Sequence, residues 1–214
     1  MQAFLILSYI PIALGSVMLP ALSRSVARGD GKDRMYAETS LRISLLSGTV
    51  LILLGTVFGP WMMAQIFGDR YTQAGALIGQ VLWLLIPLAA NHAMSGILIA
   101  GKQDRRVLLC ASMGTVFFLL VISKAVLMYN AVGAIWTAAA AMTLTSICLI
   151  TVVHKRMTID LFSSVVKPGM VLLLTMVTFY ILCFSGPEVA IACAFVTLSV
   201  GCYLLKCLTP QDII

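Results

Sequence analysis

Four polar side chains lie inside the long apolar runs of this chain, where they could bind a ligand. Lys124 is the only Lys or Arg well inside such a run, and Gln80, Asn91 and His92 share an earlier one. An ammonium at the centre of a bilayer costs about 2.5–3.5 kcal/mol on insertion scales, so it tends to persist only for a purpose. Together, these groups could neutralise an anion and hydrogen-bond a sugar.

Each of these groups has a plainer alternative role. Lys124 stands four residues, about 6 Å of helix, before the end of its run at Met128, so it either snorkels to the outer headgroups or lines a cavity. Gln80 and Asn91 are eleven residues apart, which places them on one face of a continuous helix. For these two residues and His92, hydrogen bonding between helices is favoured over lining a cavity.

Arginines gather where the first apolar run ends, in the stretch "LPALSRSVARGDGKDR" that begins at Leu19. Arg24 and Arg42 are candidate cations for binding an anionic ligand at the cytoplasmic ends of the helices, because guanidinium groups bind phosphate and carboxylate groups well. The favoured interpretation is simpler, namely that they mark the cytoplasmic side. Glu38 is expected to pair with Arg34 and Arg42, since both lie four residues from it on a helix.

The composition places these residues in a membrane protein. Hydrophobic residues make up 61% of the chain and charged residues only 10%, whereas about a quarter of the residues in a soluble domain are charged. The mean hydropathy is +1.04. The net charge of +6 would suggest nucleic acid in a soluble protein, but here the basic residues sit in short clusters between apolar runs. We therefore exclude a nucleic-acid partner.

The apolar runs predict an all-α, polytopic helix bundle in the bilayer. Seven runs are long enough to span it, at residues 3–22, 43–67, 76–100, 107–128, 132–153, 165–184 and 189–205. Small residues in the stretch 133–142 predict close helix packing, and Pro87 inside the third run predicts a bend. No linker is long enough to hold a soluble domain, so function must reside in the helices and their short connections.

The linkers alternate in charge and so predict the orientation. Twelve of the fourteen Lys and Arg residues fall in the linkers 24–42, 101–106 and 154–167 or in the C-terminal tail, which all lie on one side of a seven-span chain. Arg70 lies on the other side. Because basic residues stay in the cytoplasm, the N-terminus is predicted outside and the C-terminus inside.

Several kinds of site are excluded by the residue pattern. The six cysteines form no C-x-x-C pair, and His92 and His154 are far apart, so we expect no metal site and no cofactor. No Asp or Glu falls in the middle of a span, although a cation exporter needs a buried carboxylate. The outer turns are only four to eight residues long, which argues against an enzyme.

Four motifs in order give the chain a family resemblance. They are the Pro-x-x-Ser-Arg end of the first run with its basic Gly-Asp turn, the Phe-Gly-x-x-Tyr turn at 67–71, the Gly-Lys-Gln turn at 101–103, and the Tyr-Asn-x-x-Gly-Ala stretch at 129–134. In this order the chain resembles the C-terminal half of the O-antigen-type polysaccharide flippases of the MATE-like exporter superfamily. The resemblance covers roughly residues 5–157.

The resemblance implies a translocase of the bacterial inner membrane that serves O-antigen and lipopolysaccharide synthesis. It would move a polyprenyl-diphosphate oligosaccharide outward by alternating access, without covalent chemistry. Residues 1–157 would form five spans of the C-terminal lobe, and residues 158–214 two additional helices. The N-terminal lobe would be missing, as in a truncated reading frame or partial sequence, so the partner is another half or another copy. The alternatives are half of a cation-coupled multidrug exporter and a non-transporting membrane fragment.

Overall fold

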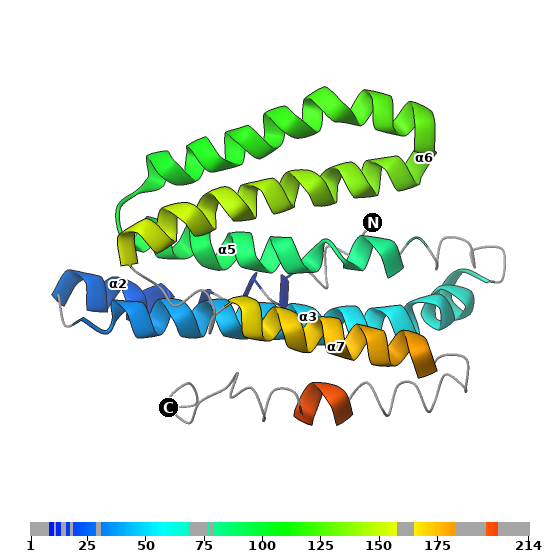
Figure 1. The fold of residues 1–214 in the computed structure, drawn as a ribbon, viewed down its shortest axis with the longest axis horizontal. Helices are drawn as coiled ribbons and strands as arrows, with labels where there is room; N and C mark the ends of the chain where they lie inside the picture. Colours follow the sequence, from blue (N-terminus) through cyan, green and yellow to red (C-terminus); the bar gives the residue numbers. More distant parts are fainter. Residues whose placement is uncertain are drawn as a thin grey trace. The chain divides into compact units, whose positions relative to one another are not determined.

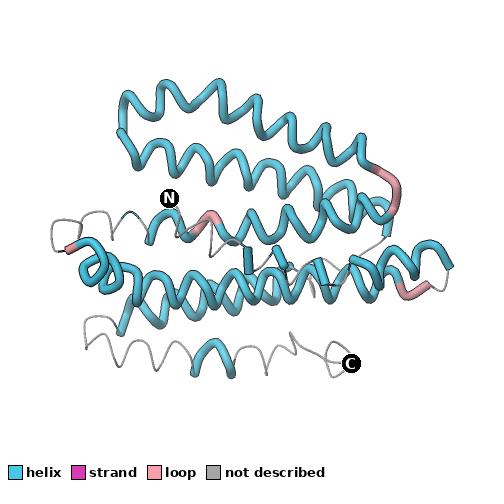
Figure 2. The backbone as a smooth tube through the Cα atoms, turned by 180° about the vertical axis from the view of Figure 1, so that it is seen from behind, coloured by secondary structure: helices cyan, strands magenta, loops and turns pink. Residues whose placement is uncertain are grey.

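The structure is a computed structural model that describes residues 9–10, 12–13, 16–17, 19–28, 31–68, 77, 79–157, 165–182 and 196–200. Nearly all of these residues are helical and none of them lies in a strand (Figures 1 and 2), so the all-α class is confirmed for them. The helices are α2 (Leu19–Arg28), α3 (Asp33–Phe67), α5 (Leu85–Ala100), α6 (Asp104–Met157) and α7 (Lys167–Leu182).

The chain divides into two compact units, Met1–Ile159 and Asp160–Ile214. The first unit holds α2, α3, α5 and α6, and the second holds α7. The division falls close to the boundary expected after residue 157. That the first unit is a transporter lobe remains a prediction.

Three helical stretches among the described residues are long and apolar enough to cross a membrane, namely Asp33–Thr56, Gly79–Ala100 and Asp104–Lys155. They overlap the runs predicted at 43–67, 76–100, 107–128 and 132–153. Half of the predicted run at 3–22 and most of the run at 189–205 fall outside the described residues. Membrane association is therefore supported, whereas the count of seven spans stays a prediction.

Helix α5 is the centre of the first unit, since it contacts α2, α3 and α6. Gly48 of α3 faces α5: a Cβ atom there would lie 3.6 Å from the Leu85 carbonyl oxygen, which is an ordinary van der Waals contact. Small residues at such contacts let helices pack tightly in lipid, where no hydrophobic force drives them together. The core side chains of this unit are mostly aliphatic and include Leu22, Ile52, Leu53, Leu85, Met94, Ile97 and Leu98.

Helix α6 reverses direction at Asn130, so it is a hairpin and not a single rod. Its apolar stretch of 52 residues would be about 78 Å long if straight, more than twice the roughly 30 Å of a bilayer core. Asn130 has φ 53° and ψ −136°, near the first central position of a type II′ turn. Figures 1 and 2 show the first half (104–129) and the second half (131–157) side by side. The turn predicted between 128 and 132 is confirmed.

Two glycines allow the halves of α6 to lie this close. A Cβ atom on Gly133 would collide with the Ala125 carbonyl oxygen and lie 2.7 Å from its carbon. A Cβ atom on Gly114 would collide with the Thr145 hydroxyl and lie 3.0 Å from the Ala141 carbonyl oxygen. The close packing predicted for the stretch 133–142 is therefore present at the hairpin.

Pro87 lies in the first turn of α5, where its missing N–H would have had no partner in the helix. Just before it, the chain makes a turn in which the Trp83 and Leu84 amides donate to Gln80 and Val81, three residues back. The bend predicted at this proline therefore takes the form of a tighter turn ahead of α5.

The basic turns lie at one end of the first unit. Figures 1 and 2 place the α2–α3 turn, around Gly31, and the α5–α6 turn, residues 101–103, at the same end, and the reversal of α6 at the other. Four of the five basic residues in 24–42 precede residue 35 and so are close to the α2–α3 turn. Lys102 lies in the α5–α6 turn, and Arg105 and Arg106 follow it. This is the distribution expected when one end faces the cytoplasm.

Large apolar side chains cover the outside of α6. In the most apolar 18-residue segment of α6 only 11% is buried, and Leu127 is 86% exposed. A water-soluble protein rarely exposes such a continuous apolar surface, whereas lipid would cover it at no cost. The exposed apolar residues are Leu108, Leu109, Met113, Val116, Leu119, Leu120, Leu127, Met128, Trp136 and Ile147.

Candidate functional site

Asn91 links α5 to the second half of α6. Its amide nitrogen donates to the Met142 carbonyl oxygen at 3.2 Å, and its amide oxygen lies 2.8 Å from the Ser146 hydroxyl. That hydroxyl also lies 2.9 Å from the Met142 carbonyl oxygen and 3.4 Å from the Pro87 carbonyl oxygen, so its single proton has three acceptors within reach. The favoured interpretation from the sequence, hydrogen bonding between helices, describes what Asn91 does here.

We expect Asn91 and Ser146 to be energetically coupled. In a double-mutant cycle of Asn91→Ala and Ser146→Ala, the coupling should be about 0.6 kcal/mol and at most about 1.7, as for other hydrogen bonds between membrane helices. The measurement is the free energy of SDS-induced unfolding in mixed micelles. Thr143→Ala is the matched control, because the exposed Thr143 hydroxyl donates to Ala139 in its own helix at 2.7 Å. Equal coupling of Asn91 to Thr143 would contradict the contact.

Gln80 lies before the turn at Trp83, separated by it from α5. The sequence-based expectation that Gln80 and Asn91 share a face assumed a continuous helix over residues 76–100. The tighter turn interrupts this helix, so an eleven-residue spacing no longer fixes the face. The Gln80 side-chain oxygen is buried and has no hydrogen-bond partner within the described residues.

His92 and Lys124 are both exposed within the first unit. Neither makes a hydrogen bond or an ion pair to another described residue. Lys124 stands six residues, about 9 Å of helix, before the reversal at Asn130, which keeps it within reach of the headgroup region. Both roles considered for Lys124, snorkelling and lining a cavity, are compatible with this position.

Arg24 is an exposed side chain in α2. Its Nε–H donates to the Pro20 carbonyl oxygen, four residues earlier, at 3.1 Å. This bond uses one of the five donors of the guanidinium and leaves both terminal NH₂ groups available. Arg24 is therefore accessible, whereas its place at a cytoplasmic mouth stays a prediction.

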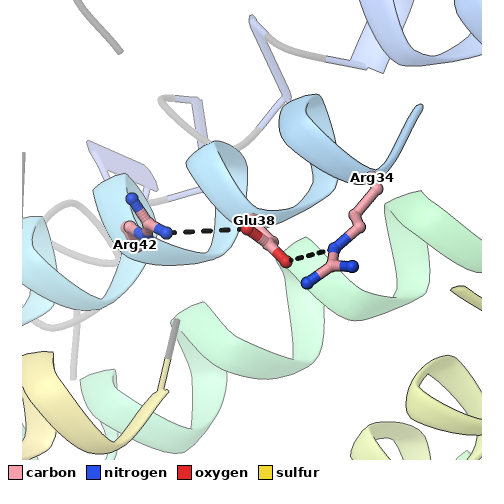
Figure 3. A network of polar contacts seen from close by, with 3 residues as sticks. All are labelled: Arg34, Glu38 and Arg42. Atoms are coloured by element: carbon pink, nitrogen blue, oxygen red, sulfur yellow. Dashed lines mark hydrogen bonds and ion pairs between the residues drawn. The ribbon is translucent and has the colours of Figure 1, made fainter. Parts of the chain in front are cut away.

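Arg42 is held by its own helix and is nearly buried. Figure 3 shows Glu38 between Arg34 and Arg42 on successive turns of α3. The Glu38 carboxylate lies 2.9 Å from Nε of Arg34 and 3.6 Å from Nη2 of Arg42. The side chain of Arg42 is only 10% exposed, against 50% for Arg34. The predicted pairing is confirmed, and it makes Arg42 less accessible to a ligand than Arg24.

Further polar side chains are buried along the inner face of α3. Ser44 and Thr49 are 0% and 1% exposed, and Thr49 donates to the Leu45 carbonyl oxygen at 2.9 Å. The Ser44 hydroxyl is buried without a hydrogen-bond partner among the described residues. Buried polar atoms of this kind are commonly satisfied by ordered water.

The six sequence-predicted residues do not form one cluster in the described structure. No hydrogen bond or ion pair joins Gln80, His92 or Lys124 to another of the six within the described ranges. The part of the chain that the structure describes also holds no group of three or more His, Cys, Asp or Glu side chains that could bind a metal ion. The arrangement thus supplies separate cations and hydrogen-bonding groups along the helices.

Comparison with known proteins gives no relative for this chain. No protein-family model matches it, and neither the curated proteins nor the solved structures contain a match. The functional argument therefore rests on the residues and their placement.

Two partners of the predicted residues have no sequence signal. Ser146 is 55 residues from Asn91, and nothing in its neighbourhood marks it. Tyr36 lines the same recess as Arg24 only because α2 and α3 fold against each other. To find either residue, one would need to know how the two neighbouring helices are aligned and rotated against each other.

Proposed function

We propose that this chain is the C-terminal half of a membrane translocase that moves polyprenyl-diphosphate-linked oligosaccharide across the cytoplasmic membrane. Transport would occur by alternating access, in which helices rock against a second lobe and expose the substrate to one side at a time. The second lobe is supplied by further sequence or by another chain.

This proposal rests on one observation, the positions of the four sequence motifs along the helices. The Pro-x-x-Ser-Arg motif lies in the first half of α2, Phe67 and Gly68 end α3, the Gly-Lys-Gln motif forms the α5–α6 turn, and the Tyr-Asn-x-x-Gly-Ala motif forms the α6 reversal. The last three motifs thus fall at helix ends or turns. Tyr71 of the second motif lies outside the described residues.

The proposed topology has seven spans, with the N-terminus outside and the C-terminus in the cytoplasm. The shared end of the two basic turns supports it (Figure 1), because basic residues are retained on the cytoplasmic side. Under this topology α6 crosses the membrane twice and its reversal at Asn130 faces outward. The exposed apolar surface of α6 is then the surface in contact with lipid or with the second lobe.

In this proposal the exposed cations bind the substrate diphosphate. Arg24 is placed at the cytoplasmic mouth and Lys124 near the outer end, so that each cation meets the diphosphate on one side of the membrane. His92 and Gln80 would meet sugar hydroxyls along the path, whereas Asn91 and Arg42 are engaged within the protein.

A cation-coupled multidrug exporter fits this half less well. Such exporters need a carboxylate near the middle of the membrane. The described spans carry Asp33, Glu38 and Asp104, all within the first two turns of their helices.

We expect cells that lack the gene for this chain to lose surface polysaccharide and to accumulate the lipid-linked oligosaccharide in the inner leaflet. Lys124→Ala in the chromosomal gene should lower surface polysaccharide at least fivefold with protein level unchanged, because it removes the membrane cation. Lys155→Ala is the matched control and should export normally. Normal polysaccharide in the deletion strain would overturn the flippase proposal, while normal export by Lys124→Ala would assign Lys124 to snorkelling.

A further inference from the structure

A small polar recess lies between the end of α2 and the start of α3. Its volume is about 220 Å³, and its lining consists of Ala21, Arg24, Ser25, Arg28 and Tyr36. Arg24 and Arg28 are four residues apart and so project from one face of α2, while Tyr36 comes from the next helix. The recess therefore presents two guanidinium groups and the Tyr36 hydroxyl, a set of hydrogen-bond donors suited to an anion.

The two arginines are available to such an anion. The bond from Arg24 to the Pro20 carbonyl oxygen, at 3.1 Å, orients its guanidinium without occupying the terminal NH₂ groups. Arg28 makes no hydrogen bond or ion pair to any residue that the structure describes, and both arginines are exposed. The nearest carboxylate along α3 after Tyr36, that of Glu38, is paired with Arg34 and Arg42.

Two exposed apolar side chains are close in sequence to residues that line the recess. Val17, four residues before Ala21, is 67% exposed, and Met35, next to Tyr36, is 38% exposed. A basic recess flanked in sequence by apolar side chains suits a molecule with an anionic head and hydrocarbon tails.

We propose that this recess binds the phosphodiester headgroup of an anionic glycerophospholipid of the cytoplasmic leaflet. Guanidinium groups bind phosphate oxygens through paired, charge-assisted hydrogen bonds, and basic pockets between helices on the cytoplasmic side are known binding places for anionic headgroups. The inference rests on the cytoplasmic placement of the α2–α3 turn in the proposed function. It does not depend on which molecule is transported.

The test uses the full chain purified in detergent, with phosphatidylglycerol added and the bound fraction measured by native mass spectrometry. We expect phosphatidylglycerol to bind at least tenfold more tightly than phosphatidylcholine, which carries a compensating cation. The double variant R24Q/R28Q should bind phosphatidylglycerol at least tenfold more weakly, a change of about 1.4 kcal/mol. Tyr36→Phe removes a single hydroxyl and should weaken binding several-fold. It keeps the proposal testable if the double variant does not fold.

The matched control is R105Q/R106Q, which removes the same charge from an exposed site at the other basic turn. It should bind phosphatidylglycerol within about twofold of the unmodified chain. Equal binding of the two lipids, or equal losses in both double variants, would overturn the proposal and indicate diffuse charge attraction. Displacement of the lipid by millimolar inorganic phosphate would also overturn it and assign the recess to free phosphate. Because the proposed function also assigns Arg24 to the substrate diphosphate, Tyr36→Phe separates the two roles: it should weaken lipid binding and leave polysaccharide export unchanged.

Discussion

Gly133→Ala is expected to open the α6 hairpin. A single added methyl group would collide with the Ala125 carbonyl oxygen and lie 3.1 Å from Cβ of Tyr129. Because most of this clash is with backbone, no side-chain rotation relieves it, and the two halves must separate near Asn130. Overpacking of this kind costs about 1–3 kcal/mol or more. The measurement is the midpoint of thermal unfolding in detergent, together with the free energy of SDS-induced unfolding.

Gly169→Ala is the matched control for this prediction. Gly169 lies in α7, and a Cβ atom there would meet nothing within 4 Å. Alanine is favoured over glycine in helices by about 1 kcal/mol, so this variant should be neutral or slightly more stable. A Gly133→Ala protein as stable as the Gly169→Ala protein would contradict the close approach of the two halves.

Helix ends could be predicted from the sequence because local residues set them. The third run was predicted to end at residue 100, where the α5–α6 turn begins at Gly101. The second was predicted to end at residue 67, and Gly68, with φ 84°, ends α3 in the left-handed conformation that favours glycine. The polar pair Tyr129 and Asn130, which lies between two apolar runs, predicts the reversal near Asn130. Each of these signals is contained within a few residues.

Side-chain partners were predictable only where they are local. The Glu38 pairs follow from a spacing of four residues on a helix, which sequence alone supplies. The contact between Asn91 and Ser146 depends on how α5 and α6 are rotated against each other, and no single-sequence pattern encodes that rotation. The face shared by Gln80 and Asn91 could not be predicted either, because the turn before Pro87 changes the helical phase between them.

The position of Arg42 shows how charge counts and accessibility diverge. In the sequence it is one of five basic residues in the linker 24–42 and equivalent to Arg24. In the structure the Arg42 guanidinium lies beside Glu38, and the Arg42 side chain is only 10% exposed. The Arg24 side chain, in contrast, is exposed. Both can mark the cytoplasmic side, because topology is set before helices pack, but only Arg24 remains available to a ligand.

Glu38→Gln is expected to destabilise the first unit strongly. Glutamine keeps the shape of the side chain but removes its charge, which leaves the nearly buried Arg42 without the carboxylate at 3.6 Å. Removing one partner of a buried ion pair costs about 3–5 kcal/mol. We expect the lower end of this range, because the Arg42 and Glu38 side chains are still 10% and 15% exposed. The apparent free energy of unfolding in mixed micelles measures the loss.

The order of the single variants tests the cause. Arg34→Gln should cost no more than about 1 kcal/mol, since Arg34 is half exposed and its pair is weakened by solvent. Arg42→Gln should cost less than Glu38→Gln, because Glu38 then keeps Arg34 as a partner at 2.9 Å and no buried charge is left unpaired. The double variant E38Q/R42Q should regain part of the stability lost in Glu38→Gln, since it also removes the cation that has lost the Glu38 carboxylate. A double variant less stable than Glu38→Gln would mean that Arg42 stabilises the unit through contacts other than this pair.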